Sequence, residues 1–241
     1  MEIFLEVETW VALLTLTFLE IVLGIDNIIF ISIVSNKLPK QRQGKARTVG
    51  LLLALILRVG LLLGITWIIS FKEPLFTIFD LDVSGRDLIL LAGGLFLLAK
   101  STREIHHKIE GETRHESERQ SASFAGVILQ IVLLDMIFSF DSILTAVGLT
   151  EEVLLMIIAV IISIGVMMAF SKKISDFISS HPTLEILALS FLILIGFVLI
   201  ADGLHQHIPK GYIYAAVAFS LLVEIVNINV RKRETSNKDS Q

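Results

Sequence analysis

The sequence contains no cysteine and few charged residues, and each shortage excludes some classes of protein or site. Without cysteine among its 241 residues, the chain has no disulfide and no thiolate site for a soft metal ion. Charged residues make up 18% of the chain, against about a quarter in a soluble domain. No glycine-rich phosphate loop occurs, which argues against ATP-driven chemistry in this chain. Residues 1–6 contain no basic residue, so we expect no cleaved signal peptide and a first span that remains as an anchor.

What the chain has in excess is apolar residues, at 54% of the composition and a mean hydropathy of +0.79. They gather in runs of about twenty residues, the length that crosses a hydrocarbon core of about 30 Å. Such spans must be helical, because an open strand leaves its backbone unsatisfied in lipid. We therefore predict one all-α polytopic membrane domain over residues 1–241, with transmembrane helices at about 10–34, 48–70, 86–101, 124–148, 153–171, 184–201 and 212–230.

The segments between these seven spans alternate in charge. Basic residues occur in the segments 37–47, 100–119, 172–173 and 231–233. The intervening loops instead carry Glu73, Asp80, Asp82, Glu151, Glu152 and Asp202. By the positive-inside rule, this pattern predicts an outer N-terminus and a cytoplasmic C-terminus. We also expect a cytoplasmic loop at about 105–123 and a polar tail at 231–241, disordered from Glu234 onward.

An acidic motif occurs twice. Residues 20–27 read EIVLGIDN and residues 135–142 read DMIFSFDS, so each has an acid, a second acid six positions later, and then a polar residue. Three spans separate the copies, which places them on helices of opposite direction. This predicts a 3+3 inverted repeat, with repeat one at about 10–104, repeat two at about 124–201 and the helix at about 212–230 as an extra element. Inverted repeats are a transporter architecture with the substrate site near the midplane.

The two motifs place four carboxylates, Glu20, Asp26, Asp135 and Asp141, near the middle of the membrane. Each costs roughly 2.5–3.5 kcal/mol there, so something must offset the charge. With Asn27 and Ser142 as neutral oxygen donors, the set is hard and all-oxygen, which suits Mg²⁺, Ca²⁺ or Mn²⁺. Acids six positions apart do not share a helix face, and we expect the first helix to loosen near Gly24 so that they converge.

Three explanations for these acids stay open on the residues alone, with ion binding preferred. In the first, the acids bind a divalent cation. In the second, they pair with a buried cation purely for structure, and Arg58, in the middle of the second span, is the available partner. In the third, they relay protons without a metal.

The motif residues, together with residues 86–91 and 104–106, closely resemble the TerC family of integral membrane proteins. The resemblance covers about residues 10–231. It implies manganese export from a bacterial cytoplasm across the inner membrane, with a historical link to tellurite resistance. Carried onto this chain, the family's acidic ion-site positions are Glu20, Asp26, Asp135 and Asp141.

These considerations predict a secondary transporter, not an enzyme, that exports a divalent cation, with Mn²⁺ the preferred substrate and proton antiport as its coupling. Arg58 would balance the acids' charge when the site is empty. The alternative is a non-transport membrane scaffold or a stress (tellurite) resistance component. An intramembrane aspartyl protease is disfavoured, because Asp26 and Asp141 lack the flanking motifs of such enzymes. We expect no tightly bound cofactor and no nucleic-acid partner; the partners are the metal ion and the lipid bilayer.

Overall fold

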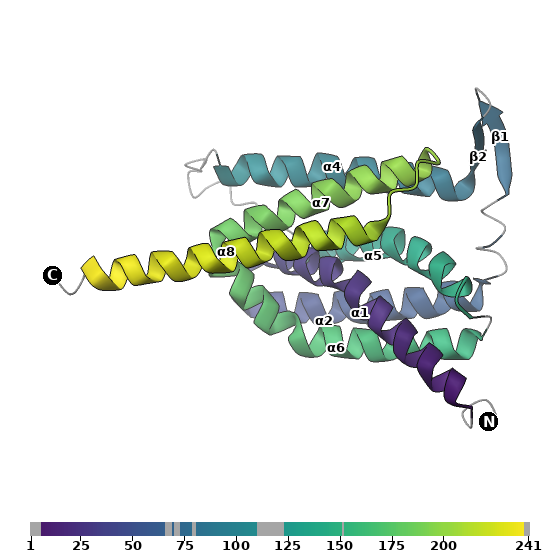
Figure 1. The fold of residues 1–241 in the computed structure, drawn as a ribbon, viewed down its shortest axis with the longest axis horizontal. Helices are drawn as coiled ribbons and strands as arrows, with labels where there is room; N and C mark the ends of the chain where they lie inside the picture. The colour runs from purple at the N-terminus through teal and green to yellow at the C-terminus, as the bar shows by residue number, and fades with distance from the viewer. Residues whose placement is uncertain are drawn as a thin grey trace.

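The computed structural model describes residues 6–65, 69, 73–78, 81–109, 123–150 and 152–238. Within these ranges the chain forms seven long helices and one short β-hairpin (Figure 1). The elements are α1 (Val7–Ser35), α2 (Lys40–Leu63), β1 (Pro74–Ile78), β2 (Leu81–Ser84), α4 (Gly85–Ile109), α5 (Phe124–Val147), α6 (Val153–Ser179), α7 (Pro182–Gly203) and α8 (Lys210–Lys238). The predicted all-α polytopic class is confirmed in its main features.

Six of the described helices are long and apolar enough to cross a membrane: α1, α2, α5, α6, α7 and α8. The third predicted span, α4, is a helix of 25 residues but is not among them. Its uncharged stretch covers only residues 88–99, because Arg86 and Asp87 precede it and Lys100 follows it.

Several predicted element ends are wrong in the same direction, because the helices continue beyond the apolar runs. Helix α2 begins at Lys40, so most of the basic segment predicted as a loop is helical. Helix α4 enters the predicted 105–123 loop as far as Ile109, and α8 extends through the tail predicted to be disordered, as far as Lys238. Lysine, arginine, glutamine and glutamate favour helix as strongly as leucine does, so hydropathy marks only the apolar part of each helix.

The hairpin was not predicted. Strands β1 and β2 pair antiparallel with Thr77 opposite Asp82, and the Thr77 hydroxyl donates to the Asp82 carboxylate at 2.7 Å. Its acidic residues predicted a loop between two spans, although the apolar and β-branched residues at 75–78 favour a strand.

The helices group into two packed units. In the four-helix unit, α1 packs on α6 and α5 packs on α2, with further contacts between α1 and α5 and between α2 and α6. Helices α4 and α7 pack along each other as a pair, which we call the arm, and contacts between the arm and the four-helix unit are sparser. Figure 1 shows α4 and α7 together on one side of α1, α2 and α6, with α8 crossing in front. Helix α8 packs mainly on α7.

The arm is held by a direct backbone contact. A Cβ atom on Gly94 of α4 would lie 2.5 Å from the carbonyl oxygen of Gly196 in α7, and one on Gly196 would lie 2.9 Å from that of Gly94. Neither position has room for a side chain, so the two backbones touch. Such contacts between small residues are typical of helix packing in membranes, where close van der Waals contact drives association.

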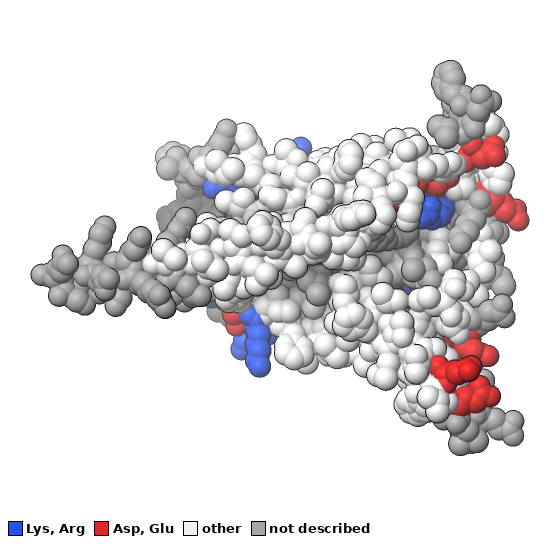
Figure 2. Space-filling model, in the orientation of Figure 1, with Lys and Arg blue, Asp and Glu red and all other residues white. Residues whose placement is uncertain are grey.

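The two ends of the bundle differ in charge. At the end where α1 and α6 finish, which we call the basic end, lie Lys37, Lys40, Arg42, Lys45, Lys100, Arg103, Lys108, Lys172 and Lys173. At the opposite, acidic end lie Glu6, Glu8, Glu73, Asp82 and Glu152. Figure 2 shows most acidic side chains of the visible face at the end that carries the hairpin and the N-terminus, with one acidic patch beside basic side chains at the opposite end.

Candidate cation-binding site in the four-helix unit

Each acidic motif lies on an unbroken helix, and this fixes which of its residues share a face. Seven positions along a helix are about 700° of rotation, so residue i+7 returns almost to the direction of residue i. Asn27 is seven positions after Glu20 in α1, and Ser142 is seven positions after Asp135 in α5. The first acid of each motif therefore shares a helix face with the motif's final polar residue.

Arg58 of α2 joins the two motifs. Its Nη1 donates to Glu20 Oε2 at 2.6 Å, and its Nη2 donates to Asp135 Oδ1 at 2.8 Å. Its Nε lies 3.2 Å and 3.3 Å from the two Asp135 oxygens. The three side chains are 3%, 7% and 6% exposed, so this is a buried triad of two acids and one guanidinium.

Neutral donors complete the triad. The Asn27 amide of α1 donates to Asp135 Oδ1 at 3.3 Å, which links the two motifs a second time. The Ser139 hydroxyl donates to Asp135 Oδ2 at 3.0 Å, and the Ser142 hydroxyl lies beside the Glu20 carboxylate. The structure thus brings Glu20, Asn27, Arg58, Asp135 and Ser142 of the predicted site together.

Ser139 is a site residue that the prediction did not include. Ser139 follows Asp135 by four residues, a spacing that places two side chains next to each other on a helix. That spacing was the available signal. Gly24 occupies the equivalent position in α1.

The expected loosening of the first helix near Gly24 is wrong, because α1 is helical without interruption from Val7 to Ser35. Gly24 instead gives room to Met167 of α6: a Cβ atom there would lie 2.7 Å from Met167 Sδ. The side chains of Asp26 and Asp141 lie outside the described residues. Within the part that is described, no three acids or histidines are grouped so as to hold a metal ion.

A small cavity of about 10 Å³ adjoins the Glu20 carboxylate, which is space for about one water molecule. Its other lining residues come from α1, from α5 and from the turn after α5: Leu16, Leu19, Leu23, Ser142, Ala146 and Leu149. Most of these residues lie between Glu20 and the acidic end. Glu20 is therefore the acid of the triad that borders a cavity, and the cavity lies on the acidic-end side of Glu20.

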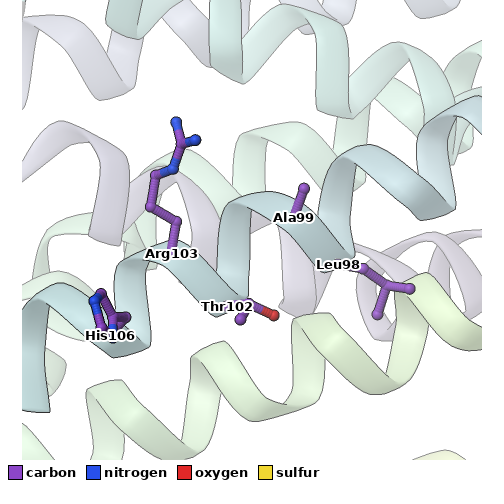
Figure 3. Close-up of a pocket in the computed structure, with 5 residues that line it drawn as sticks. All are labelled: Leu98, Ala99, Thr102, Arg103 and His106. Carbon is purple, nitrogen blue, oxygen red and sulfur yellow. The ribbon is translucent and has the colours of Figure 1, made fainter.

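A larger hollow of about 550 Å³ lies away from the acids, on α4. Its lining residues, Leu98, Ala99, Thr102, Arg103 and His106, all belong to this one helix (Figure 3). It is an open concavity along a helix surface, and it contains none of the predicted site residues.

Comparison with known proteins agrees with the motif. The family described as "Integral membrane protein TerC family" matches residues 5–239. A UPF0053 protein of Haemophilus influenzae is 52% identical over 226 residues, covering 93% of this chain and 95% of the relative. The UPF0053 inner membrane protein YgdQ of Escherichia coli K12 is 53% identical over 224 residues, covering 93% of this chain and 94% of YgdQ. No solved structure matches.

A third relative is longer. The UPF0053 inner membrane protein YoaE of Escherichia coli K12 is 48% identical over 233 residues, which cover 96% of this chain but 45% of YoaE. Two of these relatives are named inner membrane proteins, and with six candidate spans this chain is a multi-pass protein of the bacterial inner membrane. The match over nearly the whole chain shows that it belongs to the TerC family of integral membrane proteins.

Proposed function

We propose that this chain is a secondary transporter that exports a divalent metal cation, with Mn²⁺ as its substrate, from the cytoplasm. The observation that carries the proposal is the buried triad, in which Arg58 holds one acid from each motif. A cation-handling site explains why two helices from different halves of the chain bring carboxylates to the same place in the membrane.

The charges of the triad support an exchange between Arg58 and a metal ion. Two carboxylates and one guanidinium leave a net charge of about −1, and Asp26 and Asp141 add further negative charge when ionised. A divalent cation entering beside Glu20 competes with Arg58 for the same oxygens. Arg58 then serves as the built-in counter-ion of the empty site, so that the acids are not left unpaired after the metal departs.

The donors in and next to the triad fit a hard cation. Carboxylate, amide and hydroxyl oxygens come from Glu20, Asn27, Asp135, Ser139 and Ser142, and this set suits Mn²⁺, Mg²⁺ or Ca²⁺. The choice of Mn²⁺ among these ions rests on the family resemblance. Asp26 and Asp141 stay predicted ligands on the family resemblance alone, because residues six positions apart on an unbroken helix do not share a face.

Helix packing supports the inverted repeat. If α1, α2 and α4 correspond to α5, α6 and α7, a two-fold operation exchanges the α1–α6 contact with the α5–α2 contact. The α1–α5, α2–α6 and α4–α7 contacts each map onto themselves under the same operation. The triad then lies at the interface of the repeats, where transporters of this architecture bind substrate. We infer from the positive-inside rule that the basic end is cytoplasmic.

Export needs an energy source. Moving two positive charges outward against about 100 mV costs on the order of 4.6 kcal/mol before any concentration gradient. Carboxylates that bind either a metal ion or protons couple the two movements, so proton antiport is the proposed source.

The proposal is tested by cellular manganese content under manganese challenge. We expect a null strain to accumulate manganese, the intact gene to restore a low content, and Glu20→Gln, Asp26→Asn and Asp141→Asn to fail to restore it. The control is Glu185→Gln, because Glu185 is also a buried acid paired with a lysine, Lys108, but lies at the basic end of the arm. Unchanged manganese in the null strain would sink the proposal and favour the scaffold or tellurite-resistance alternative.

A further inference from the structure

One ion-pair cluster connects the arm to the four-helix unit at the basic end. Lys37, in the connection after α1, pairs with Glu104 of α4, and Lys100 pairs with the same Glu104 oxygen at 3.1 Å. The Glu104 side chain is only 15% exposed, and burial lowers the pKa of Lys37 below its usual range. The cluster is therefore partly withdrawn from water, which strengthens the attraction between its charges.

At the acidic end, the ion pairs between described side chains stay on the arm and the turn that follows it. Asp87 at the start of α4 pairs with His205 at 3.1 Å, and Asp202 near the end of α7 pairs with His207 at 3.3 Å. Neither pair reaches α1, α2, α5 or α6. At the basic end, by contrast, the Lys37–Glu104 pair joins the arm to the four-helix unit.

Between these ends, α4 touches α5 closely at Gly93. A Cβ atom on Gly93 would lie 2.4 Å from Ile137 Cγ2 of α5, so that position admits no side chain. Ile137 is two residues beyond Asp135, which places the contact at the depth of the triad. The adjacent Gly94 is in backbone contact with Gly196 of α7, so α4 is tied to its arm partner at the same level.

We propose that the arm rocks as one body about the Gly93–Ile137 contact, and that the Lys37–Glu104 pair is the gate that closes the basic end of the ion path. This inference rests on the proposed transport function and deepens it by naming the moving part and the gate. The Lys37–Glu104 pair is formed in this structure, so the gate is closed, and the small cavity beside Glu20 lies on the side of the acidic end. Rocking of one packed unit against another around a central site is how transporters with inverted repeats alternate access.

The absence of cysteine allows a direct test by reversible cross-linking of the full chain. In inverted membrane vesicles, Lys37→Cys and Glu104→Cys are bridged with a bis-methanethiosulfonate reagent whose spacer replaces the two side chains. We expect the bridge to abolish Mn²⁺ accumulation and a reducing agent to restore it, because a bridged gate cannot open.

The matched control bridges Lys108→Cys to Glu185→Cys, which replaces an ion pair inside the arm. This bridge should leave Mn²⁺ accumulation intact, because α4 and α7 are proposed to move together. Unchanged transport with the gate bridged, or equal loss with the control bridged, overturns the inference.

A second readout separates failure of the gate from failure of the transport proposal. Ser139→Cys is added to each cysteine pair to report whether the site opens to the basic end. An impermeant thiol reagent is applied, and mass spectrometry measures the labelling of residue 139. Ser142→Cys serves as a second reporter. We expect labelling in the unbridged protein, protection when residues 37 and 104 are bridged, and labelling again when residues 108 and 185 are bridged. If wild-type vesicles accumulate no Mn²⁺, transport is refuted while this pattern still supports the gate; equal labelling in all forms refutes the gate even if transport stands.

Discussion

The motifs of α1 and α5 have the same spacing but hold their first acids in different ways. Asp135 accepts three kinds of donor: Arg58 at both oxygens, the Asn27 amide and the Ser139 hydroxyl. Glu20 accepts a single nitrogen of Arg58, lies beside Ser142 and faces a cavity. The aspartate is surrounded by donors, whereas the glutamate is open on one side.

This difference assigns the two acids different tasks within the proposed site. An acid with many fixed donors is costly to strip of them, so Asp135 anchors Arg58 and holds the two helices together. An acid with few donors and an adjoining cavity exchanges partners at lower cost, so Glu20 is the acid that leaves Arg58 for the metal ion. The near-symmetric sequence motif thus produces an asymmetric site.

The largest expected effect compares the two acids directly. Asp135→Asn should lower the free energy of unfolding by about 3–5 kcal/mol, because it neutralises one partner of a buried ion pair and replaces one of two accepting oxygens by an NH2 group, which leaves buried donors unpaired. Glu20→Gln should lower it by about 1–2 kcal/mol, because the amide oxygen still accepts from Arg58 and Arg58 keeps Asp135. Thermal unfolding of the detergent-solubilised protein, followed by loss of the monodisperse peak in size-exclusion chromatography, measures both.

A control removes the ion triad as a whole. The triple variant Glu20→Gln, Arg58→Met, Asp135→Asn should recover most of the stability lost in Asp135→Asn, because neutral side chains replace every buried charge. It should remain inactive in export. Equal stability losses in the two single variants would mean that Asp135 is no more of an anchor than Glu20.

The next effect tests the extra donor of α5. Ser139→Ala should cost about 1.5–3 kcal/mol, because it removes a hydrogen bond to a buried carboxylate. The matched control is Ser163→Ala in α6: this serine is equally buried, but its hydroxyl donates only to the carbonyl of Val160 in its own helix, at 3.0 Å. We expect a small change there by the same thermal assay. Similar losses of stability in Ser139→Ala and Ser163→Ala would show that the Ser139 hydroxyl does not help to hold Asp135 in place.

The sequence predicted the helices more fully than the geometry of the site. Apolar runs are long and unambiguous in a membrane protein, so every predicted span has its helix. The seven-residue spacing of Glu20 and Asn27 places them on one helix face, but the prediction did not use it. Hydropathy does not register charged helix ends, which is why the start of α2 at Lys40 and the extension of α8 were missed.

Tertiary contacts account for the rest. The sequence identified Arg58 as the available cation. Its simultaneous ion pairs with Glu20 and Asp135, however, depend on how α2 packs against α1 and α5. Gly24 was taken for a helix break, because a glycine between two acids has the same appearance in a sequence whether it loosens a helix or gives room to a neighbour. Only the position of Met167 distinguishes the two roles.

The smallest expected effect returns to the fourth position of each motif, which is glycine in α1 and serine in α5. Gly24→Ala places a Cβ atom 2.7 Å from Met167 Sδ, an overlap that costs about 1–3 kcal/mol, while the gain in helix propensity returns about 1 kcal/mol. Because methionine is flexible, we expect a net loss near 1 kcal/mol in the thermal assay.

The control and a relief variant decide whether Met167 is the cause. Gly165→Ala in α6 should be neutral or stabilising, since a Cβ atom there meets nothing within 4 Å. Met167→Val should cancel the added cost of Gly24→Ala, which a double-mutant cycle measures as coupling.

In the Met167→Val background, Gly24→Ser then copies the α5 motif by placing a hydroxyl four residues after Glu20. If the new hydroxyl donates to Glu20 as Ser139 donates to Asp135, the variant is more stable than the Met167→Val background and exports Mn²⁺ more slowly. Faster export at equal stability would contradict the idea that Glu20 exchanges partners because it has few donors.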